Sequence, residues 1–454
     1  MSKPLLFSLA LLAAACGASA THPDASTDSG PDSGPACAFE LVPPSALDVG
    51  QGAPLRFGVT SSQGRTALEV RSAPEGAWGA ADAPFDAVTV RAPYSVSGAV
   101  TVTVEATCDN GGRAQRTATL NVRAMQWQAL PAWMPGTTGP IGREYGAMWV
   151  DQTQPDRMLM YGGFVYEPQQ FTPSNEWWEY SLTGNTWTPL MPAMASPGLP
   201  GGRFAQGPAG AQGLFFGGLS GRSTPSATHR VSYARDSLAW EAQDTARTRP
   251  SGDYQPGLVY DAARARYVSF CGAGARGYHC GVWLFDPMTQ RWTESNDLET
   301  DPLPAGRNGF AFVHDVPSQR VVMFSGERGG SGSNTCDCAE DTWSLDLTQT
   351  PPRWALLTPT GTTPPPRRNS GFAYDSDTHR MLVWGGTSDG RNSVPGLWLL
   401  SLDRGHERWS RVDVPNGPRL RSSSMIVYDS ARKRFVAGFG NGPNPFTDLW
   451  ALSL

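Results

Sequence analysis

One hydrophobic pattern recurs six times over the last three-quarters of the chain. Each copy is a short apolar run that closes on a glycine, and the closing glycines are Gly163, Gly218, Gly272, Gly326, Gly386 and Gly440. They are separated by 55, 54, 54, 60 and 54 residues. A regular period of this length indicates an architecture built from repeated units that bury their faces against their neighbours.

Each unit contains four apolar stretches with a fixed order of aromatic residues. The stretch after each glycine loop carries one of Trp178, Tyr233, Trp283, Trp343, Trp398 and Trp450. The next stretch carries a tryptophan in five units, namely Trp187, Trp240, Trp292, Trp354 and Trp409. Large aromatic rings fill the space between packed sheets. We therefore expect these residues to form the core and not a stacking surface for a ligand.

The paired glycines followed by spaced tyrosine and tryptophan resemble the kelch repeat over residues 125–454. This resemblance implies an all-β, six-bladed kelch β-propeller with four strands in each blade. The sixth unit ends after its third stretch at Leu454, and residues 125–130 have the form of the missing fourth stretch. We predict that the strand of Trp127 pairs with the strand of Trp450 and closes the ring, which protects the sheet edges.

Residues 37–124 have a different character. Short runs of alternating polar and apolar residues, such as 55–59, 87–90 and 100–106, are separated by Gly, Pro and Asn turns. Alternation with a period of two is typical of strands in a half-buried sheet. The segment predicts a small β-sandwich that precedes the propeller and resembles an immunoglobulin-like domain.

The N-terminus has the features of an export signal. Lys3 and the apolar run 5–15 form a segment that is too short to span a bilayer as a mature helix. Residues 12–16 resemble a lipobox, which implies cleavage after residue 15 and lipid modification of Cys16. An ordinary secretory cleavage site at residues 18–20 is the alternative. Gly17 follows the cysteine, which by resemblance to bacterial sorting rules predicts an outer-membrane lipoprotein of the cell envelope. Residues 16–36 have almost no apolar side chains and predict a disordered tether.

The cysteine count agrees with export. Seven cysteines are present, and six remain if Cys16 carries lipid. In an oxidising compartment we expect the disulfides Cys37 with Cys108, Cys271 with Cys280, and Cys336 with Cys338. A metal site built from the last four cysteines is the alternative, but their spacing lacks paired CxxC motifs. We expect no metal and no cofactor.

The longer loops of the repeats fall on one face of the predicted propeller, where binding usually resides on a rigid scaffold. Five units carry an arginine near the start of the first strand, and the third unit has an aspartate there. The resulting candidate ligand-binding ring is Arg143, Arg203, Asp253, Arg307, Arg367 and Arg421. Guanidinium groups suit carboxylates, sulfates or acidic peptides. The alternative is a structural role, because arginine at this position is common in kelch repeats.

The sequence offers little support for catalysis. It has no HExxH or GxSxG motif, and residues 272–277 match GxGxxG without the strand–helix context that motif needs. The net charge is -5 and basic runs are absent, which argues against nucleic acid as a partner.

Two hypotheses about function follow from the sequence. The first is a non-catalytic binding or scaffold module of the envelope, which would engage a protein or an acidic glycan through the long-loop face. The alternative is an envelope carbohydrate-active enzyme, epimerase- or hydrolase-like, that uses the arginine-lined mouth with an acidic residue such as Asp253 or Glu327. Some kelch propellers are enzymes, so the resemblance allows both.

Overall fold

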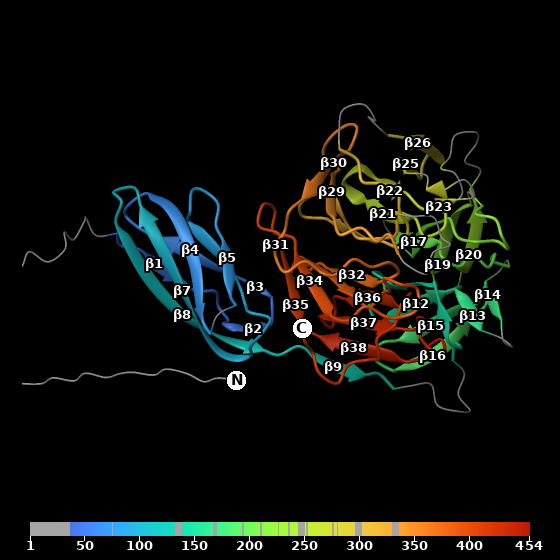
Figure 1. Ribbon diagram of the computed structural model, residues 1–454, viewed down its shortest axis with the longest axis horizontal. Coiled ribbons are helices and arrows are strands. Elements are labelled where there is room, and N and C mark those ends of the chain that lie inside the picture. The colour runs from blue at the N-terminus through green and yellow to red at the C-terminus, as the bar shows by residue number, and fades with distance from the viewer. Residues whose placement is uncertain are drawn as a thin grey trace, which may run out of the picture.

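The computed structural model describes residues 37–454, apart from 75, 132–138, 167–169, 193–194, 209–210, 226, 235–236, 244–249, 251–252, 275–276, 279, 296–301 and 329–335. The predicted signal peptide, the lipidation site Cys16 and the predicted tether therefore lie outside the described residues. Figure 1 shows two groups of sheets, a smaller one formed by the N-terminal residues and a larger one formed by the rest. No helix in the described part of the chain is long and apolar enough to cross a membrane.

The N-terminal group, called the N-terminal unit below, consists of two four-stranded sheets. The first has the strand order β1 (Glu40–Val42), β3 (Pro54–Thr60), β6 (Ala87–Arg91) and β5 (Trp78–Ala80). The second has the order β2 (Asp48–Gly50), β8 (Arg113–Arg123), β7 (Gly98–Cys108) and β4 (Arg65–Ala73). Alternate residues of the strands point into one shared hydrophobic core, as Val100, Val102 and Val104 on β7 and Val88 and Val90 on β6 do. This is the period-two alternation that the sequence shows.

Six larger sheets of four or five strands follow along the chain, and we number them 1 to 6. Sheets 1 and 2 contain β11 (Ala147–Val150), β12 (Arg157–Tyr161), β15 (Trp177–Ser181) and β16 (Thr186–Leu190), then β17 (Arg203–Gln206), β18 (Gln212–Phe216), β19 (Thr228–Ala234) and β20 (Ser237–Ala242). Sheets 3 and 4 contain β21 (Gly257–Asp261), β22 (Arg266–Phe270), β25 (Val282–Asp286) and β26 (Arg291–Glu294), then β27 (Ala311–Asp315), β28 (Arg320–Phe324), β29 (Thr342–Asp346) and β30 (Arg353–Leu357). Sheet 5 contains β32 (Gly371–Asp375), β33 (Arg380–Trp384), β34 (Leu397–Ser401) and β35 (Arg408–Val412), with β31 (Thr360–Gly361) added at its edge.

Sheet 6 is assembled from both ends of this region. Its order is β36 (Met425–Asp429), β37 (Arg434–Gly438), β38 (Leu449–Ser453) and β9 (Gln126–Ala129). Strand β9 pairs antiparallel with β38, with Trp127 opposite Leu452 and Ala129 opposite Trp450. The predicted pairing of the Trp127 strand with the Trp450 strand is therefore confirmed.

The first strands of the six sheets contact one another in succession. Strand β11 contacts β17, and the contacts continue through β21, β27 and β32 to β36, which contacts β11 again. Short additional elements lie in the loops: β10 (Arg143–Glu144), β13 (Phe164–Tyr166), β14 (Phe171–Pro173), β23 (Ala273–Gly274), β24 (Gly277–Tyr278) and the 3-10 helix η1 (Ala262–Arg264). The first strands thus surround a common centre.

Aromatic pairs join each sheet to the one before it. In each pair the ring from the fourth strand packs on a ring at the end of the preceding second strand. The pairs are Trp240–Tyr161, Trp292–Phe216, Trp354–Phe270, Trp409–Phe324, Trp127–Trp384 and Trp187–Phe439, with centroids 4.7, 5.0, 4.7, 4.8, 5.9 and 5.8 Å apart. Trp240, Trp292, Trp354 and Trp409 are buried. The repeated tryptophans are therefore core residues, as the sequence predicts.

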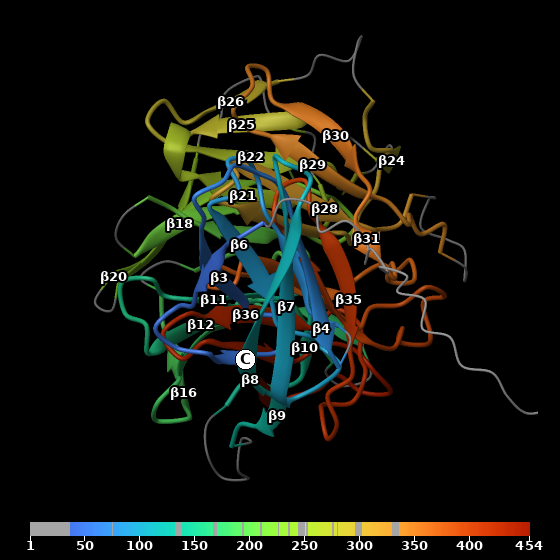
Figure 2. The ribbon, with the colours of Figure 1, turned by 90° about the vertical axis from the view of Figure 1, so that its left-hand side faces the viewer.

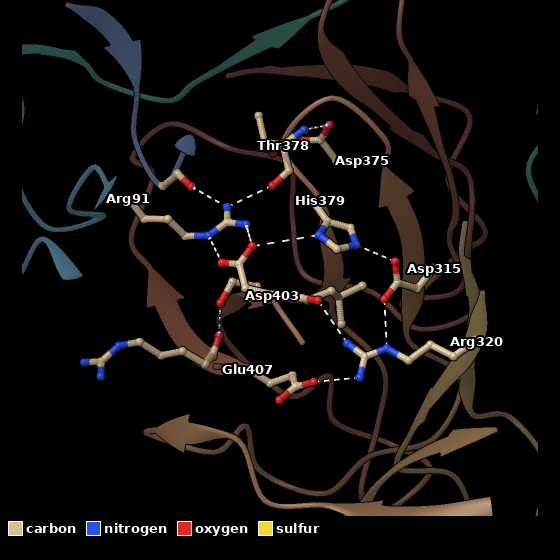
Figure 3. Close-up of polar contacts among 12 residues, drawn as sticks. Arg91, Asp315, Arg320, Asp375, Thr378, His379, Asp403 and Glu407 are labelled. Carbon is tan, nitrogen blue, oxygen red and sulfur yellow. Dashed lines mark hydrogen bonds and ion pairs between the residues drawn. The ribbon is translucent and has the colours of Figure 1, made fainter. Parts of the chain in front are cut away.

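The N-terminal unit contacts sheet 5 through a buried ion pair. Figures 1 and 2 place the unit against the side of the larger group, and Figure 3 shows the contact in detail. Arg91, at the end of β6, is 1% exposed and donates to both carboxylate oxygens of Asp403 at 2.5 and 2.7 Å. It also donates to the carbonyl of Thr378 at 2.8 Å. Arg380 of sheet 5 donates a hydrogen bond of 2.8 Å to the carbonyl of Gln51 in the N-terminal unit.

His379 lies between two carboxylates beneath this ion pair (Figure 3). Its Nε2 contacts Asp315 of sheet 4, and its Nδ1 lies 3.8 Å from Asp403. Arg320 lies on the far side of Asp315, at 2.8 Å. Burial lowers the pKa of His379, but the hydrogen bonds and charges of Asp315 and Asp403 outweigh burial and raise it to about 9. The protonated imidazole therefore links sheet 4, sheet 5 and the contact with the N-terminal unit.

We expect the free energy of unfolding to decrease as the pH rises into the alkaline range, because His379 then loses its proton. Its folded pKa of about 9 lies above the ordinary value of 6.5, so its stabilisation is complete below pH 6.5 and is lost as the pH rises through 9. In urea unfolding followed by tryptophan fluorescence, His379→Gln should be less stable than the wild type by about 2 kcal/mol at pH 6. The two proteins should converge near pH 10. A difference that stays constant with pH would contradict a charged His379.

Candidate functional site

Six residues in the left-handed backbone conformation form a ring at one end of the first strands. Each lies two residues before its strand: Tyr145, Gly201, Gln255, Gly309, Asn369 and Ser423, with φ between 54° and 77° for the whole set. Amide-to-carbonyl bonds link neighbours in this ring, from Gly201 to Tyr145, Gln255 to Gly201, Asn369 to Gly309 and Ser423 to Asn369, at 2.9, 2.9, 2.8 and 2.7 Å. Four of the six are not glycine, and strained backbone of this kind concentrates at functional sites.

The residue before each ring member pairs with the residue after the second glycine of the same unit. The six pairs are Glu144–Phe164, Pro200–Leu219, Tyr254–Ala273, Asn308–Glu327, Arg368–Thr387 and Ser422–Asn441. We call these twelve residues the mouth ring. Its backbone repeats six times while its side chains differ in every unit. A fixed backbone with varied side chains is the pattern expected of a recognition surface.

Two connected cavities occupy the axis. The outer one, of about 440 Å³, is lined mainly by mouth-ring residues and by Arg222 and Thr224. The inner one, of about 390 Å³, is lined by the first strands of the six sheets. Tyr145, Gln255 and Asn369 line both. The mouth ring is therefore the entrance to a space inside the ring of sheets.

The mouth ring carries a buried ion pair and polar atoms without partners. Arg368 of sheet 5 binds Glu327 of sheet 4, and the Glu327 side chain is 4% exposed. Among the described residues, Asn308 Oδ1 and Arg368 Nε have no hydrogen-bond partner. Buried polar atoms are nearly always satisfied in folded proteins, so exceptions that line a cavity point to a ligand or ordered water.

Glu144 is the acidic residue of the mouth ring whose pKa is shifted from its ordinary value. It is 6% exposed. Burial raises its pKa to about 7, although hydrogen bonds with Asn441 and Ser423 act in the opposite direction. The carboxyl group is therefore about half protonated at neutral pH, which is the range required of a general acid or base.

A series of aromatic rings leads from the surface to the mouth. Tyr166 and Phe171, which are 44% and 47% exposed, lie 5.3 Å apart on the β13–β14 hairpin. Phe171 contacts Phe164 at 6.3 Å, Phe164 contacts Tyr145 at 6.4 Å, and Tyr145 contacts Tyr254 at 5.7 Å. These rings offer flat apolar faces beside the polar groups of the mouth.

Four of the arginines predicted as a ligand ring make the same internal bonds. Arg143, Arg307, Arg367 and Arg421 are each at most 1% exposed. Each Nε donates to the carbonyl two residues earlier, and each Nη1 donates to the carbonyl that follows the second strand. Three also bind the carboxylate before the third strand: Arg143–Glu176, Arg307–Asp341 and Arg421–Asp448. These bonds fasten the loop at the mouth to its own sheet.

Arg367 differs because Gly396 occupies the place of the carboxylate in sheet 5. Its Nη2 has no hydrogen-bond partner among the described residues, and burial lowers its pKa to about 10. Asp253 holds the equivalent position in sheet 3, where it is 2% exposed and its carbonyl accepts from the amide of Gly218 at 2.9 Å. The ligand role of these five residues stays a prediction.

Arg203 does not occupy the position that the sequence alignment assigned to it. It begins β17, so it lies two residues after the ring member Gly201 and four residues after the position of the anchoring arginines, which Leu199 holds. The cause is a shift of four residues in the second unit, where glycines and prolines replace the usual pattern. Arg203 instead lines the inner cavity.

The three predicted cysteine pairs are joined in the structure: Cys37–Cys108, Cys271–Cys280 and Cys336–Cys338. Their Cα atoms lie 5.6, 4.0 and 5.0 Å apart. The last four cysteines therefore lie in two pairs, each within one loop. Cys271 replaces the first glycine of its unit and fastens the loop that leads to Arg307, whose amide contacts its sulfur at 3.0 Å.

The candidate ring that the sequence predicts and the mouth ring are different sets of side chains. Sequence reasoning selected the arginines because they recur, whereas the mouth ring lies one residue further on and shows no recurrence. The sequence signal that could have found the mouth ring is the variation of its side chains from unit to unit. The position directly after the recurring arginine or aspartate holds a different residue in each of these units: Glu144, Tyr254, Asn308, Arg368 and Ser422.

Comparison with known proteins supports a propeller-like β fold. The solved structure titled "Structure of YjhT" aligns with a TM-score of 0.52 at 14% identity and covers 72% of this chain and 97% of that chain. Sequence relatives include an adagio-like protein 2 of Oryza sativa subsp. japonica, 28% identical over 186 residues, and the serine/threonine-protein phosphatase BSL2 of Arabidopsis thaliana, 29% identical over 147 residues. No protein-family model matches.

These relatives are kelch-repeat-like and share only part of their length with this chain. The matches cover 38% and 32% of the chain but 28% and 13% of the two relatives. Low-identity kelch-like relatives and an all-β structure with many small antiparallel sheets support a kelch or β-propeller relationship. Fold likeness alone does not carry function.

Arg307 and Arg367 provide a matched test of the anchoring role. Removal of Arg307 would leave Asp341 without its cation, whereas removal of Arg367 leaves no unpaired carboxylate. Breaking a buried pair costs about 3 kcal/mol or more. We expect Arg307→Met to lower the free energy of unfolding by about 2 kcal/mol more than Arg367→Met does, measured by urea unfolding. Equal losses would show that the carboxylate contributes nothing to the anchor.

Proposed function

We propose that this chain is a cell-envelope lipoprotein whose residues 125–454 form a six-bladed kelch-type β-propeller that acts as a non-catalytic binding module. Sheets 1 to 6 are the blades, and β9 completes the sixth blade. The repeated aromatic pairs, the succession of first strands and the kelch-like relatives support this proposal. The binding surface is the mouth ring.

One observation carries the binding proposal. The mouth ring displays different side chains on a sixfold-repeated backbone above a cavity, and several buried polar atoms there lack a partner among the described residues. The neighbouring aromatic series adds flat apolar faces. This combination suits a ligand that is rich in hydrogen-bonding groups, such as a glycan or a polar protein loop.

The N-terminal unit is proposed as an immunoglobulin-like spacer, and Cys16 as the lipidated residue of an outer-membrane lipoprotein. The unit contacts residues 378–380, where β33 begins, while the mouth residues lie where β33 ends. An anchor on this side would therefore leave the mouth ring free. Incorporation of labelled palmitate that persists in Cys16→Ser would contradict the lipid anchor.

The mouth ring can be tested without removing an ion pair. We expect Asn308→Ala/Ser422→Ala to retain the wild-type fold but to weaken ligand binding by roughly 30-fold, since each hydrogen bond contributes about 1 kcal/mol. The full chain is immobilised and screened against a glycan array and against cell-envelope extract, and retention of each hit is compared. Asn121→Ala, on the exposed surface of the N-terminal unit, is the control. Hits that the double variant retains in full would place binding elsewhere.

A second candidate function is favoured by Glu144. A buried carboxyl with a pKa of about 7, hydrogen-bonded to the cavity-lining residues Asn441 and Ser423, is suited to proton transfer, which an epimerase- or hydrolase-like activity on a carbohydrate would require. In this candidate function the mouth ring binds the substrate and Glu144 is the acid. Glu144 takes the role that the sequence assigned to Asp253 or Glu327, because Glu327 is already paired with Arg368.

Turnover of acidic sugars distinguishes the two candidates. If the chain is an enzyme, the rate of anomer exchange or hydrolysis followed by NMR should change about tenfold per pH unit on one side of pH 7, and Glu144→Gln should reduce it at least 100-fold. Glu241→Gln, a surface substitution in sheet 2, is the control. If binding is detected but no turnover occurs at any pH, the binding module stands alone.

A further inference from the structure

Arg203 is exceptional among the six residues that begin the first strands. Its counterparts in the other sheets are small or apolar: Ala147, Gly257, Ala311, Gly371 and Met425. Each of the six pairs with the last residue of its second strand, so the positions are structurally equivalent. One sheet thus presents a long cationic side chain where the other five present none.

The Arg203 side chain crosses the inner cavity. Its Cζ lies 5.6 Å from the ring centroid of Phe372, which belongs to β32 of sheet 5. Sheet 5 is three places away from sheet 2 in the succession of first strands, on the opposite side of the axis. The guanidinium therefore lies near the centre of a cavity of about 390 Å³ and below the mouth ring.

The charge of Arg203 has no compensating partner among the described residues. Among the described residues, the only groups of opposite charge that act on its guanidinium are the phenols of Tyr254 and Tyr145, and no carboxylate is among them. The groups that face it are the phenols of Tyr145 and Tyr254 and the ring of Phe372, and burial lowers its pKa. The contrast is Arg307, which is satisfied by carbonyls and by Asp341. A half-buried cation without a counter-ion attracts an anion strongly.

Neutral polar groups surround this cation. Gln255 and Asn369 line the cavity, and so does Ser424, which is 8% exposed. Asn369 Oδ1 and Ser424 Oγ have no hydrogen-bond partner among the described residues. His314 also lines the cavity, and burial lowers its pKa, which keeps it neutral. The cavity therefore offers a single positive charge together with uncharged donors and acceptors.

These features specify the chemistry of the ligand. A single cation suits one negative charge, and the Glu327 carboxylate at the entrance disfavours a polyanion. The amides and hydroxyls suit a ligand with many hydroxyl groups, and the paired rings of Tyr145 and Tyr254 suit the apolar face of a pyranose. A carboxylate-bearing monosaccharide combines all three properties and fits the volume.

We propose that the inner cavity binds the carboxylate of a sugar acid at Arg203, with the sugar ring directed toward the mouth ring. This inference rests on the proposed function, since it names the ligand class of the same axis. It assigns the charge recognition to Arg203 and not to the anchoring arginines.

Titration calorimetry of the full chain with glucuronate and galacturonate, beside glucose and galactose, tests the proposal. The key variant is Arg203→Met, which installs the side chain that sheet 6 already carries at Met425. We expect it to weaken binding of the sugar acids at least 30-fold while it leaves any binding of the neutral sugars unchanged. Because it removes an uncompensated charge, it should also keep or raise the melting temperature. Arg230→Met, on an exposed arginine of the same sheet, is the control.

Three results would overturn the proposal. They are the absence of binding to either sugar acid by the wild type, equal binding by Arg203→Met, and equal affinity for the acids and their neutral parents. A ligand from the array or extract that depends on Asn308 and Ser422 but not on Arg203 would also refute this ligand assignment, yet it would leave the binding function of the mouth ring intact. Failure of the inference and failure of the proposed function are thus separable.

Discussion

The aromatic contact between the fourth strand of one sheet and the second strand of the sheet before it is the interaction on which the rest of the structure depends. A four-stranded sheet buries too little surface to be stable alone, and this contact supplies the missing partner face. It is made six times, and Trp127–Trp384 and Trp187–Phe439 are the two cases at sheet 6, where the two ends of the region meet. Because β9 precedes sheet 1 and completes sheet 6, no sheet is left without a neighbour on either side.

Because these aromatic contacts stabilise the fold, the side chains of the mouth ring near the axis are not needed for its stability. Anchors such as Arg307 bind two carbonyls and Asp341, and they fasten the mouth loops from behind. The six residues with a left-handed backbone conformation, which lie two residues before each first strand, then connect neighbouring loops through backbone hydrogen bonds. With the backbone held in these two ways, the side chains of the mouth ring can vary without loss of structure. Pre-organised groups of this kind bind ligands at low entropic cost.

Charges in this molecule fall into two groups that differ in their partners. Arg91, Arg320 and Arg421 lie in tight pairs with Asp403, Asp315 and Asp448, where they join parts of the chain. Arg203 has an aromatic face and phenols around it, and no described carboxylate beside it. This difference in partners is the observation from which the anion site at Arg203 is proposed.

The sequence alone determined the all-β character, the six units, the role of the tryptophans, the pairing of Trp127 with the Trp450 strand and the three cysteine pairs. The first four depend on periodicity, which a linear pattern preserves, whereas the cysteine pairs follow from the order of neighbouring cysteines along the chain, since a count alone leaves the pairing open. The tertiary structure decided which side chains meet at the axis. In the sequence, Arg203 and Arg307 both look like the arginine near the start of a repeat. In the structure, Arg203 begins its first strand and lines the cavity, whereas Arg307 lies four residues before its first strand and binds its own sheet. Likewise, Glu144 and Asn308 belong to one mouth ring only because the ring of sheets brings residues from distant units together, and burial there is what raises the pKa of Glu144.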